Sequence, residues 1–183
     1  KDFQKNPRKQ LDFIYNHEDI FLKTDFNSPT DSIEIVASNE NRIWFDFLKK
    51  EKQFKQQIQL LEKEVDYYWL KQDTAAAISK ANTFNQLQME RALLIDEMSN
   101  TQSYASKLIG MQHVPLRDGY TSKEQRDEYF KSEYFKGLNF TDEELINSSA
   151  YTDKVFNYLV LYNQKGITQN QRETRYKKAI DVI

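Results

Sequence analysis

The sequence predicts a mainly α-helical protein: a helical bundle of six or seven helices built on a long antiparallel helix pair, with a small N-terminal antiparallel β element. Three observations predict this fold class. The chain has only 4 Gly and 3 Pro in 183 residues, which disfavours an all-β fold with many tight turns. From residue 38 onward, apolar residues recur with a period of about 3.6, the repeat of an α-helix. Aromatic residues make up 14% of the chain, enough apolar surface for a packed core.

The N-terminal region is expected to form short strands. Residues 10–15 and 20–26 are rich in β-branched and aromatic residues and are separated by a polar link, so they predict a hairpin. After turn residues at 28–31, residues 33–36 predict a third strand. Such strands form little core of their own and need cover from helices or from strands further upstream. We therefore divide the chain into a remnant β element at residues 1–37, the end of an upstream β-sandwich, and a helical domain at residues 38–183.

Two long helices are expected to follow. The first covers residues 39–70, with Ser38 as its N-cap, and the second is capped by Asp73 or Thr74. The short link between them predicts an antiparallel helix hairpin. The apolar stripe of the first helix consists of Phe47, Phe54, Ile58, Leu61, Val65 and Tyr68. Its opposite face is expected to be solvated and carries Lys49, Glu51, Lys52, Lys55, Gln59, Glu62 and Lys63.

Shorter helices are predicted in the rest of the chain. Residues 103–109 form one that ends at Gly110, and residues 111–120 read as a surface loop. Residues 151–164 form another, closed by Lys165 and Gly166. Three capping boxes, in which two side chains satisfy the first amides of a helix, predict helices at residues 122–135, 142–146 and 169–183. The boxes pair Thr121 with Glu124, Thr141 with Glu144, and Thr168 with Gln171.

Composition excludes several kinds of chemistry. With 26 basic and 28 acidic residues the net charge is −2, which provides no field to hold a nucleic acid. The absence of Cys excludes disulfides and thiolate catalysis in this chain. His17 and His113 stand far apart in the sequence and are expected to be exposed loop residues. No metal or cofactor is expected, and no apolar run reaches the roughly 18 residues of a membrane span. Four arginines are expected to form helix-surface ion pairs: Arg42, Arg91, Arg172 and Arg175.

Two groups of aromatic residues are candidates for an interaction surface. The members considered are Tyr67, Tyr68, Trp69, Tyr129 and Tyr134, with Phe130 and Phe135 beside the last two. Their helical spacing is more typical of an aromatic core whose phenol groups point to water. The alternative is a groove that stacks a bound peptide.

Residues 129–142 (YFKSEYFKGLNFTD), followed by Glu144, Leu145, Ile146 and Asn147, carry a resemblance to a known family. With Tyr151 and Tyr158, this pattern resembles the helical region of TlpA-like thiol-disulfide oxidoreductases of the cell envelope. The resemblance implies an upstream β-sandwich, a periplasmic location and a thioredoxin-like domain with a Cys-x-x-Cys motif downstream. The family's catalytic residues carry over to no position here, because the chain has no Cys.

The expected function is therefore that of a non-catalytic helical module in a larger thiol-disulfide oxidoreductase. It would position the redox domain or engage client proteins. The final helix ends on apolar residues without a cap, so we expect the chain to continue into the thioredoxin-like domain. One alternative is a stand-alone peptide- or protein-binding module that uses the aromatic groove. Another is an enzyme that uses Glu, Tyr and His, which requires a histidine close to a carboxylate in a cleft.

Overall fold

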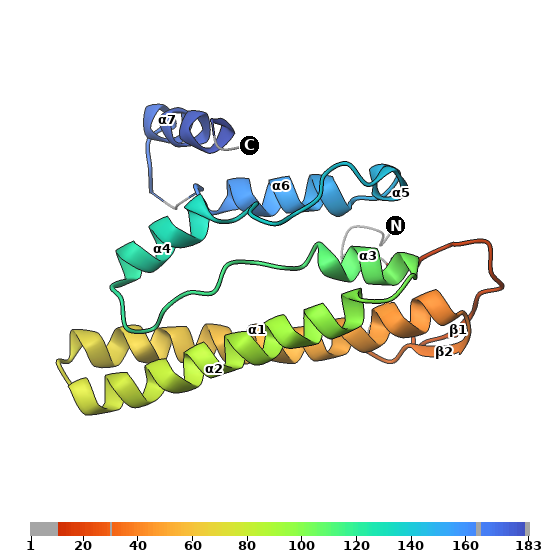
Figure 1. The fold of residues 1–183 in the computed structure, drawn as a ribbon, viewed down its shortest axis with the longest axis horizontal. Helices are drawn as coiled ribbons and strands as arrows, with labels where there is room; N and C mark the ends of the chain where they lie inside the picture. The colour runs from red at the N-terminus through yellow and green to blue at the C-terminus, as the bar shows by residue number, and fades with distance from the viewer. Residues whose placement is uncertain (1–10, 30, 164–165, 182–183) are drawn as a thin grey trace, which may run out of the picture.

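The computed structural model describes residues 11–29, 31–163 and 166–181. This part of the chain contains seven helices and one two-stranded antiparallel sheet, which confirms the predicted mainly α fold. Helices α1 (Asn39–Leu70) and α2 (Thr74–Ser99) form the predicted antiparallel pair and lie side by side in Figure 1. The shorter helices are α3 (Tyr104–Gly110), α4 (Lys123–Ser132), α5 (Glu143–Ile146), α6 (Ala150–Val160) and α7 (Gln169–Ile180). We call α4 to α7 the second layer.

The helix pair begins and turns as its sequence predicts. The Ser38 hydroxyl accepts a hydrogen bond from the Asn41 amide at 3.0 Å, and the Asp73 carboxylate accepts one from the Ala76 amide at 3.1 Å. Each side chain satisfies an amide that has no partner inside its helix. Between α1 and α2 the chain reverses at Gln72, whose φ is 59°. These local contacts fix where each helix begins and where the chain reverses between them.

Apolar residues between the two long helices form two clusters. Near the start of α1, Phe47 packs with Ile95 of α2 and Ile109 of α3. Near its end, Val65 packs with Ala81 and Phe84 of α2. The second layer has its own cluster of buried residues, formed by Phe130, Tyr134, Tyr158 and Ala179. Within the described residues, none of the helices combines the length and apolar character needed to cross a lipid bilayer.

The predicted hairpin between residues 10–15 and 20–26 is wrong. The sheet instead pairs β1 (Phe21–Lys23) with β2 (Glu34–Ala37), so the second and third predicted strands are the partners. Residue 10 lies outside the described residues, and residues 11–15 are not a strand. The Ile14 amide donates to Oδ1 of Asn41 at 2.8 Å, and Nδ2 of Asn41 donates to the Ile14 carbonyl at 2.7 Å. Because Asn41 occupies the hydrogen-bonding groups that a strand partner would use, this segment lies along the start of α1.

Two of the three predicted capping boxes are wrong, and in both the N-cap is the next residue. The N-cap of α4 is Ser122, boxed with Gln125, while the Thr121 hydroxyl donates to the Asp118 carbonyl at 2.9 Å. The N-cap of α5 is Asp142, which accepts from the Glu144 amide, while the Thr141 hydroxyl donates to the Asn139 side chain at 2.7 Å. In both cases the Thr forms a local turn contact before the helix and the better capping residue follows it. The third box, which starts α7, is confirmed.

Helix ends also differ from the prediction. α3 includes Gly110 as its last residue and does not use it as a left-handed cap. α4 ends at Ser132, and the chain then turns through Gly137, whose φ is 76°. α6 ends at Val160. Its predicted last residue, Gln164, and the predicted closing residue Lys165 lie outside the described residues. α7 ends at Ile180. Residues 182 and 183, the last two of the predicted helix, also lie outside the described residues.

Residues 111–122, which we call the connecting segment, run along the helix pair and join α3 to α4 (Figure 1). Gly119 in this segment donates to the Asn85 side chain at 2.8 Å and accepts from the Trp69 indole at 3.0 Å. A Cβ at Gly119 would lie 2.9 Å from both the Cα and the Cβ of Ala81. Glycine is therefore required where the segment touches α2.

Gly119→Ala is expected to lower the free energy of unfolding by about 1–3 kcal/mol, the usual cost of overpacking a close contact. Urea denaturation followed by circular dichroism measures this change. Gly110→Ala is the matched control, because its Cβ would meet only Ser99 at 3.6 Å, an ordinary contact, within a helix. Equal stability of the two variants would contradict the close approach at Gly119.

Candidate binding cleft

A cleft of about 1190 Å³ lies between the helix pair and the second layer. Residues of α1 and α2 form one wall, and α4 to α6 supply residues to the other. Residues 111–112 and 114–117 of the connecting segment, residues 12–17 of the N-terminal segment, and Tyr104 and Leu108 of α3 also line the cleft. The volume exceeds the roughly 300–1,000 Å³ typical of small-molecule pockets. A segment of polypeptide would fit such a space.

A buried ion pair stands at the wall formed by the helix pair. Arg91 of α2 donates to both oxygens of Glu51 on α1, from Nε at 2.8 Å and from Nη2 at 2.6 Å. Both side chains are buried, at 3% exposure for Glu51 and 7% for Arg91. Arg91 also donates to the Gln112 carbonyl at 3.0 Å, and Lys55 approaches Glu51 to 3.0 Å from one turn further along α1. The pair therefore joins α1, α2 and the connecting segment.

Lys154 of α6 contributes a second buried cation to the cleft. Its side chain is 5% exposed, and its Nζ donates to the His113 carbonyl and lies 4.7 Å from the centre of the Tyr134 ring. Burial, together with the positive charges of Arg91 and Lys55, lowers the pKa of Lys154 to about 8, and burial has the largest effect. Within the described residues, no carboxylate forms an ion pair with this amine. Lys154 is thus a buried cation that has no carboxylate counter-ion within the described residues.

The stability of the folded chain is expected to depend on the protonation of Lys154. Its pKa is lowered from the 10.5 of an ordinary lysine, so the unfolded chain binds this proton more tightly. The penalty for the buried charge is complete below about pH 8 and disappears as the pH rises toward 10.5. Between about pH 7 and pH 10, the free energy of unfolding of the wild-type chain should rise by about 2–3 kcal/mol relative to that of Lys154→Met. Urea denaturation at both pH values tests this, and a constant difference would contradict it.

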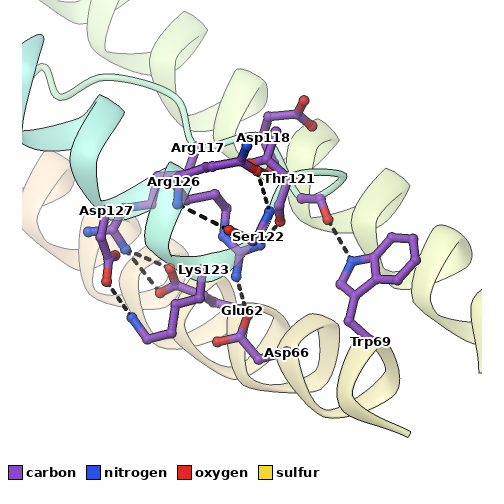
Figure 2. A network of polar contacts seen from close by, with 12 residues as sticks. Glu62, Asp66, Trp69, Arg117, Asp118, Thr121, Ser122, Lys123, Arg126 and Asp127 are labelled. Carbon is purple, nitrogen blue, oxygen red and sulfur yellow. Dashed lines mark hydrogen bonds and ion pairs between the residues drawn. The ribbon is translucent and has the colours of Figure 1, made fainter. Parts of the chain in front are cut away.

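A second group of charges fixes the connecting segment and α4 against α1, as Figure 2 shows. Arg117 donates to both oxygens of Glu62 on α1, at 2.8 Å and 3.0 Å, and its guanidinium lies 4.0 Å from the centre of the Phe130 ring. Arg126 of α4 is buried and donates to the Thr121 carbonyl at 2.5 Å and to Asp66 of α1. Both contacts are charge-assisted, the stronger kind of hydrogen bond, and they join the connecting segment and α4 to α1.

Apolar side chains at the cleft are accessible to a ligand. Phe13, Tyr15 and Leu116 line it and are 55%, 70% and 44% exposed. The Tyr15 ring also lies 5.6 Å from the ring of His17, which lines the same cleft. The lining therefore offers exposed apolar surface beside a buried charged centre, the combination that most ligand sites use.

The five residues predicted to form an interaction surface do not lie together in the structure. Tyr134 is buried in the core of the second layer and lines the cleft. Trp69 packs on the Val65 cluster of the helix pair, and Tyr67 and Tyr68 contact each other at a ring distance of 5.2 Å. Tyr129 is exposed and lines a smaller hollow of about 380 Å³. The proposed interaction surface at these five residues stays a prediction.

The sequence interpretation missed the charged residues of the cleft. Glu51 was expected on a solvated face and Arg91 in a surface ion pair, but both are buried. The spacing contained a signal for Glu51, which stands four residues after Phe47 and seven before Ile58 and so belongs to the apolar stripe. Lys154 likewise precedes the buried Tyr158 by one helical turn. A charged residue on an apolar stripe indicates a buried ionic contact with another element.

The histidines occupy different surroundings. His113 lies 2.9 Å from Asp96, measured from Nε2 to Oδ1, and the Asp96 side chain is 65% exposed. His17 lines the large cleft. Within the described residues, no three His, Asp or Glu side chains gather in a way that would hold a metal ion. No protein-family model, curated protein or solved structure matches this chain.

Proposed function

We propose that this chain is a non-catalytic helical module that binds an extended polypeptide segment in the cleft between its helix pair and its second layer. The cleft is the observation that carries the proposal. It has a volume of about 1190 Å³, and the exposed side chains of Phe13, Tyr15 and Leu116 line it. Accessible apolar surface of this kind is a common mark of a protein-binding site.

The parent protein is proposed to be a thiol-disulfide oxidoreductase of the cell envelope. The resemblance of residues 129–142 to TlpA-like proteins supports this part of the proposal. In such a parent, the reactive thiols belong to a thioredoxin-like domain, and the present chain, which has no Cys, holds a client protein or positions that domain. The role of holding a client protein requires a surface that accepts a polypeptide, and the cleft is such a surface.

Binding of an unfolded probe tests the cleft. Fluorescein-labelled, reduced and carboxymethylated lactalbumin should bind the chain with a rise in fluorescence anisotropy. The double variant Tyr15→Ser/Leu116→Ser is expected to weaken this binding about tenfold or more, because it removes exposed apolar contacts at the cleft. Met89→Ser/Leu93→Ser is the matched control, since these exposed residues of α2 lie outside the cleft lining. Equal losses in both variants, or no binding by the wild type, would contradict the proposal.

The stand-alone aromatic groove is tested in the same assay. Tyr67→Ser/Tyr129→Ser removes two tyrosines that are 54% and 53% exposed. A loss of binding in this variant, with unchanged binding in the Tyr15→Ser/Leu116→Ser variant, would favour the groove over the cleft. Insulin reduction by the purified chain should stay at background, because the chain has no thiol. Measurable turnover would overturn the assignment as a non-catalytic module.

A further inference from the structure

We propose that Lys55, Arg91 and Lys154 form a subsite that binds an acidic side chain, Asp or Glu, of the polypeptide segment in the cleft. This inference rests on the proposed function and adds the chemistry of the ligand to it. All three cations line the cleft, and they come from α1, α2 and α6 respectively. They therefore meet only in the folded chain.

The charges at this place do not balance. Glu51 contacts Arg91 and Lys55 but not Lys154, so one carboxylate stands against three cations. In the described part of the chain, the carboxylates that line the cleft are those of Asp12, Glu62, Glu144 and Asp153. Glu62 is bound by Arg117, Glu144 by Lys107 at 3.0 Å, and the Asp153 carboxylate accepts from the Ser149 hydroxyl at 2.5 Å. Among the cations of the subsite, Lys154 is the one without an ion pair to a carboxylate within the described residues.

Hydrogen-bond donors remain available at the same place. Arg91 uses Nε and Nη2 for Glu51 and Gln112, while its Nη1 forms no hydrogen bond within the described residues. Lys154 donates to one carbonyl and lies over the Tyr134 ring, which leaves further N–H groups of its ammonium. A carboxylate accepts several such donors at once, and charge-assisted bonds of this kind are the strong ones.

Burial strengthens the preference for an anion. Lys154 is 5% exposed and Arg91 is 7% exposed, so water screens them poorly. A buried charge without a counter-ion is costly, and a ligand that supplies the counter-ion removes this cost. Lys55, whose side chain is 62% exposed, can reorient toward such a ligand. An acidic residue would hence be favoured over its amide at this position of the bound segment.

Two fluorescein-labelled peptides test the inference. Both are twelve-residue, C-terminally amidated sequences of Ser, Gly, Phe and Leu, and they differ only in one central Glu or Gln. The Glu peptide is expected to bind the wild-type chain about tenfold more tightly than the Gln peptide near neutral pH. Lys154→Met should reduce this preference to about twofold or less, measured as the ratio of the two affinities within that variant. Lys49→Met, at an exposed residue of α1 outside the cleft lining, is the control and should keep the preference.

The outcomes separate the two proposals. If both peptides bind the wild type with equal affinity, the acidic subsite is wrong and the cleft function stands. If neither the peptides nor the unfolded lactalbumin binds, both proposals are wrong. A preference that Lys154→Met leaves intact places the acidic contact elsewhere and overturns this subsite. Circular dichroism confirms that each variant is folded.

A second readout is independent of affinity. Reductive ¹³C-methylation gives each lysine an NMR signal, and Lys154→Met identifies the Lys154 signal by its loss. Saturating Glu peptide should raise the pKa of this amine toward that of an ordinary lysine, because the ligand carboxylate favours the charged form. The Gln peptide should leave it unchanged. An unchanged pKa with the Glu peptide would overturn the subsite.

Discussion

Replacement of Glu51 by glutamine is expected to lower the free energy of unfolding by about 3–5 kcal/mol, the range for breaking a buried ion pair from one side. The variant leaves Arg91 buried without its counter-ion and removes the carboxylate that also contacts Lys55. Urea denaturation near neutral pH, followed by helical circular dichroism, gives the value. The pair joins both long helices to the connecting segment, so the midpoint of the urea unfolding transition should shift to a lower urea concentration.

Two comparisons show whether burial is the cause. Asp127→Asn breaks a solvent-exposed pair with Lys123 within α4 and is expected to cost less than about 1 kcal/mol. The double variant Glu51→Leu/Arg91→Leu removes both charges, and we expect it to be more stable than Glu51→Gln, because no unpaired charge remains buried. A double variant that is less stable than the single one would contradict this explanation.

Tyr158→Ala is expected to destabilise the second layer by about 3–5 kcal/mol, as large aromatic deletions in a core do. The side chain is fully buried, with ring centres of Phe135 at 4.7 Å and Tyr134 at 5.1 Å. Its hydroxyl lies 2.9 Å from that of Tyr162. Hydrogen exchange measured by mass spectrometry should show lost protection in α6 and α7.

The same experiment reports on how the two layers are coupled. The cluster around Tyr158 is separate from the clusters of Phe47 and Val65 in the helix pair. Amides of α1 and α2 should therefore keep most of their protection in Tyr158→Ala. Phe156→Ala, at a 65% exposed position of the same helix, is the control and should change little. Equal loss of protection throughout the chain would mean that the layers unfold as one unit.

The sequence predicted the helices well because their signals are local. The apolar period of α1 and the caps at Ser38 and Asp73 each depend on residues within one or two turns. The predicted N-caps of α4 and α5 were wrong because two neighbouring residues could each cap the helix. Thr121 and Thr141 stand next to better caps, and each of them forms a turn contact instead. Ser and Asp are better N-caps than Thr, so this preference outweighed the Glu three residues after each Thr that the capping-box prediction relied on.

The N-terminal segment was misread for a different reason. Alternating apolar residues at 11–15 are compatible with a strand, but their backbone partner is the side chain of Asn41. Glu18 reaches the same end of α1, where it accepts from the Asn39 amide at 2.9 Å and from the Ser38 hydroxyl at 2.5 Å. These hydrogen bonds lower the pKa of the Glu18 carboxyl, the Ser38 contact most of all. Partners twenty or more residues apart leave no periodic pattern in the sequence.

By itself, the sequence determined where the long helices begin and reverse and that they form an antiparallel pair, because neighbouring residues decide caps, turns and the apolar period. Tertiary structure decided which charges are buried. Glu51 and Arg91 stand forty residues apart, and Lys154 reaches their cleft from a third helix. Burial of this pair depends on the contact of α1 with α2 and with the connecting segment, and that contact exists only after the helices have packed. The charged centre of the cleft is a product of this packing.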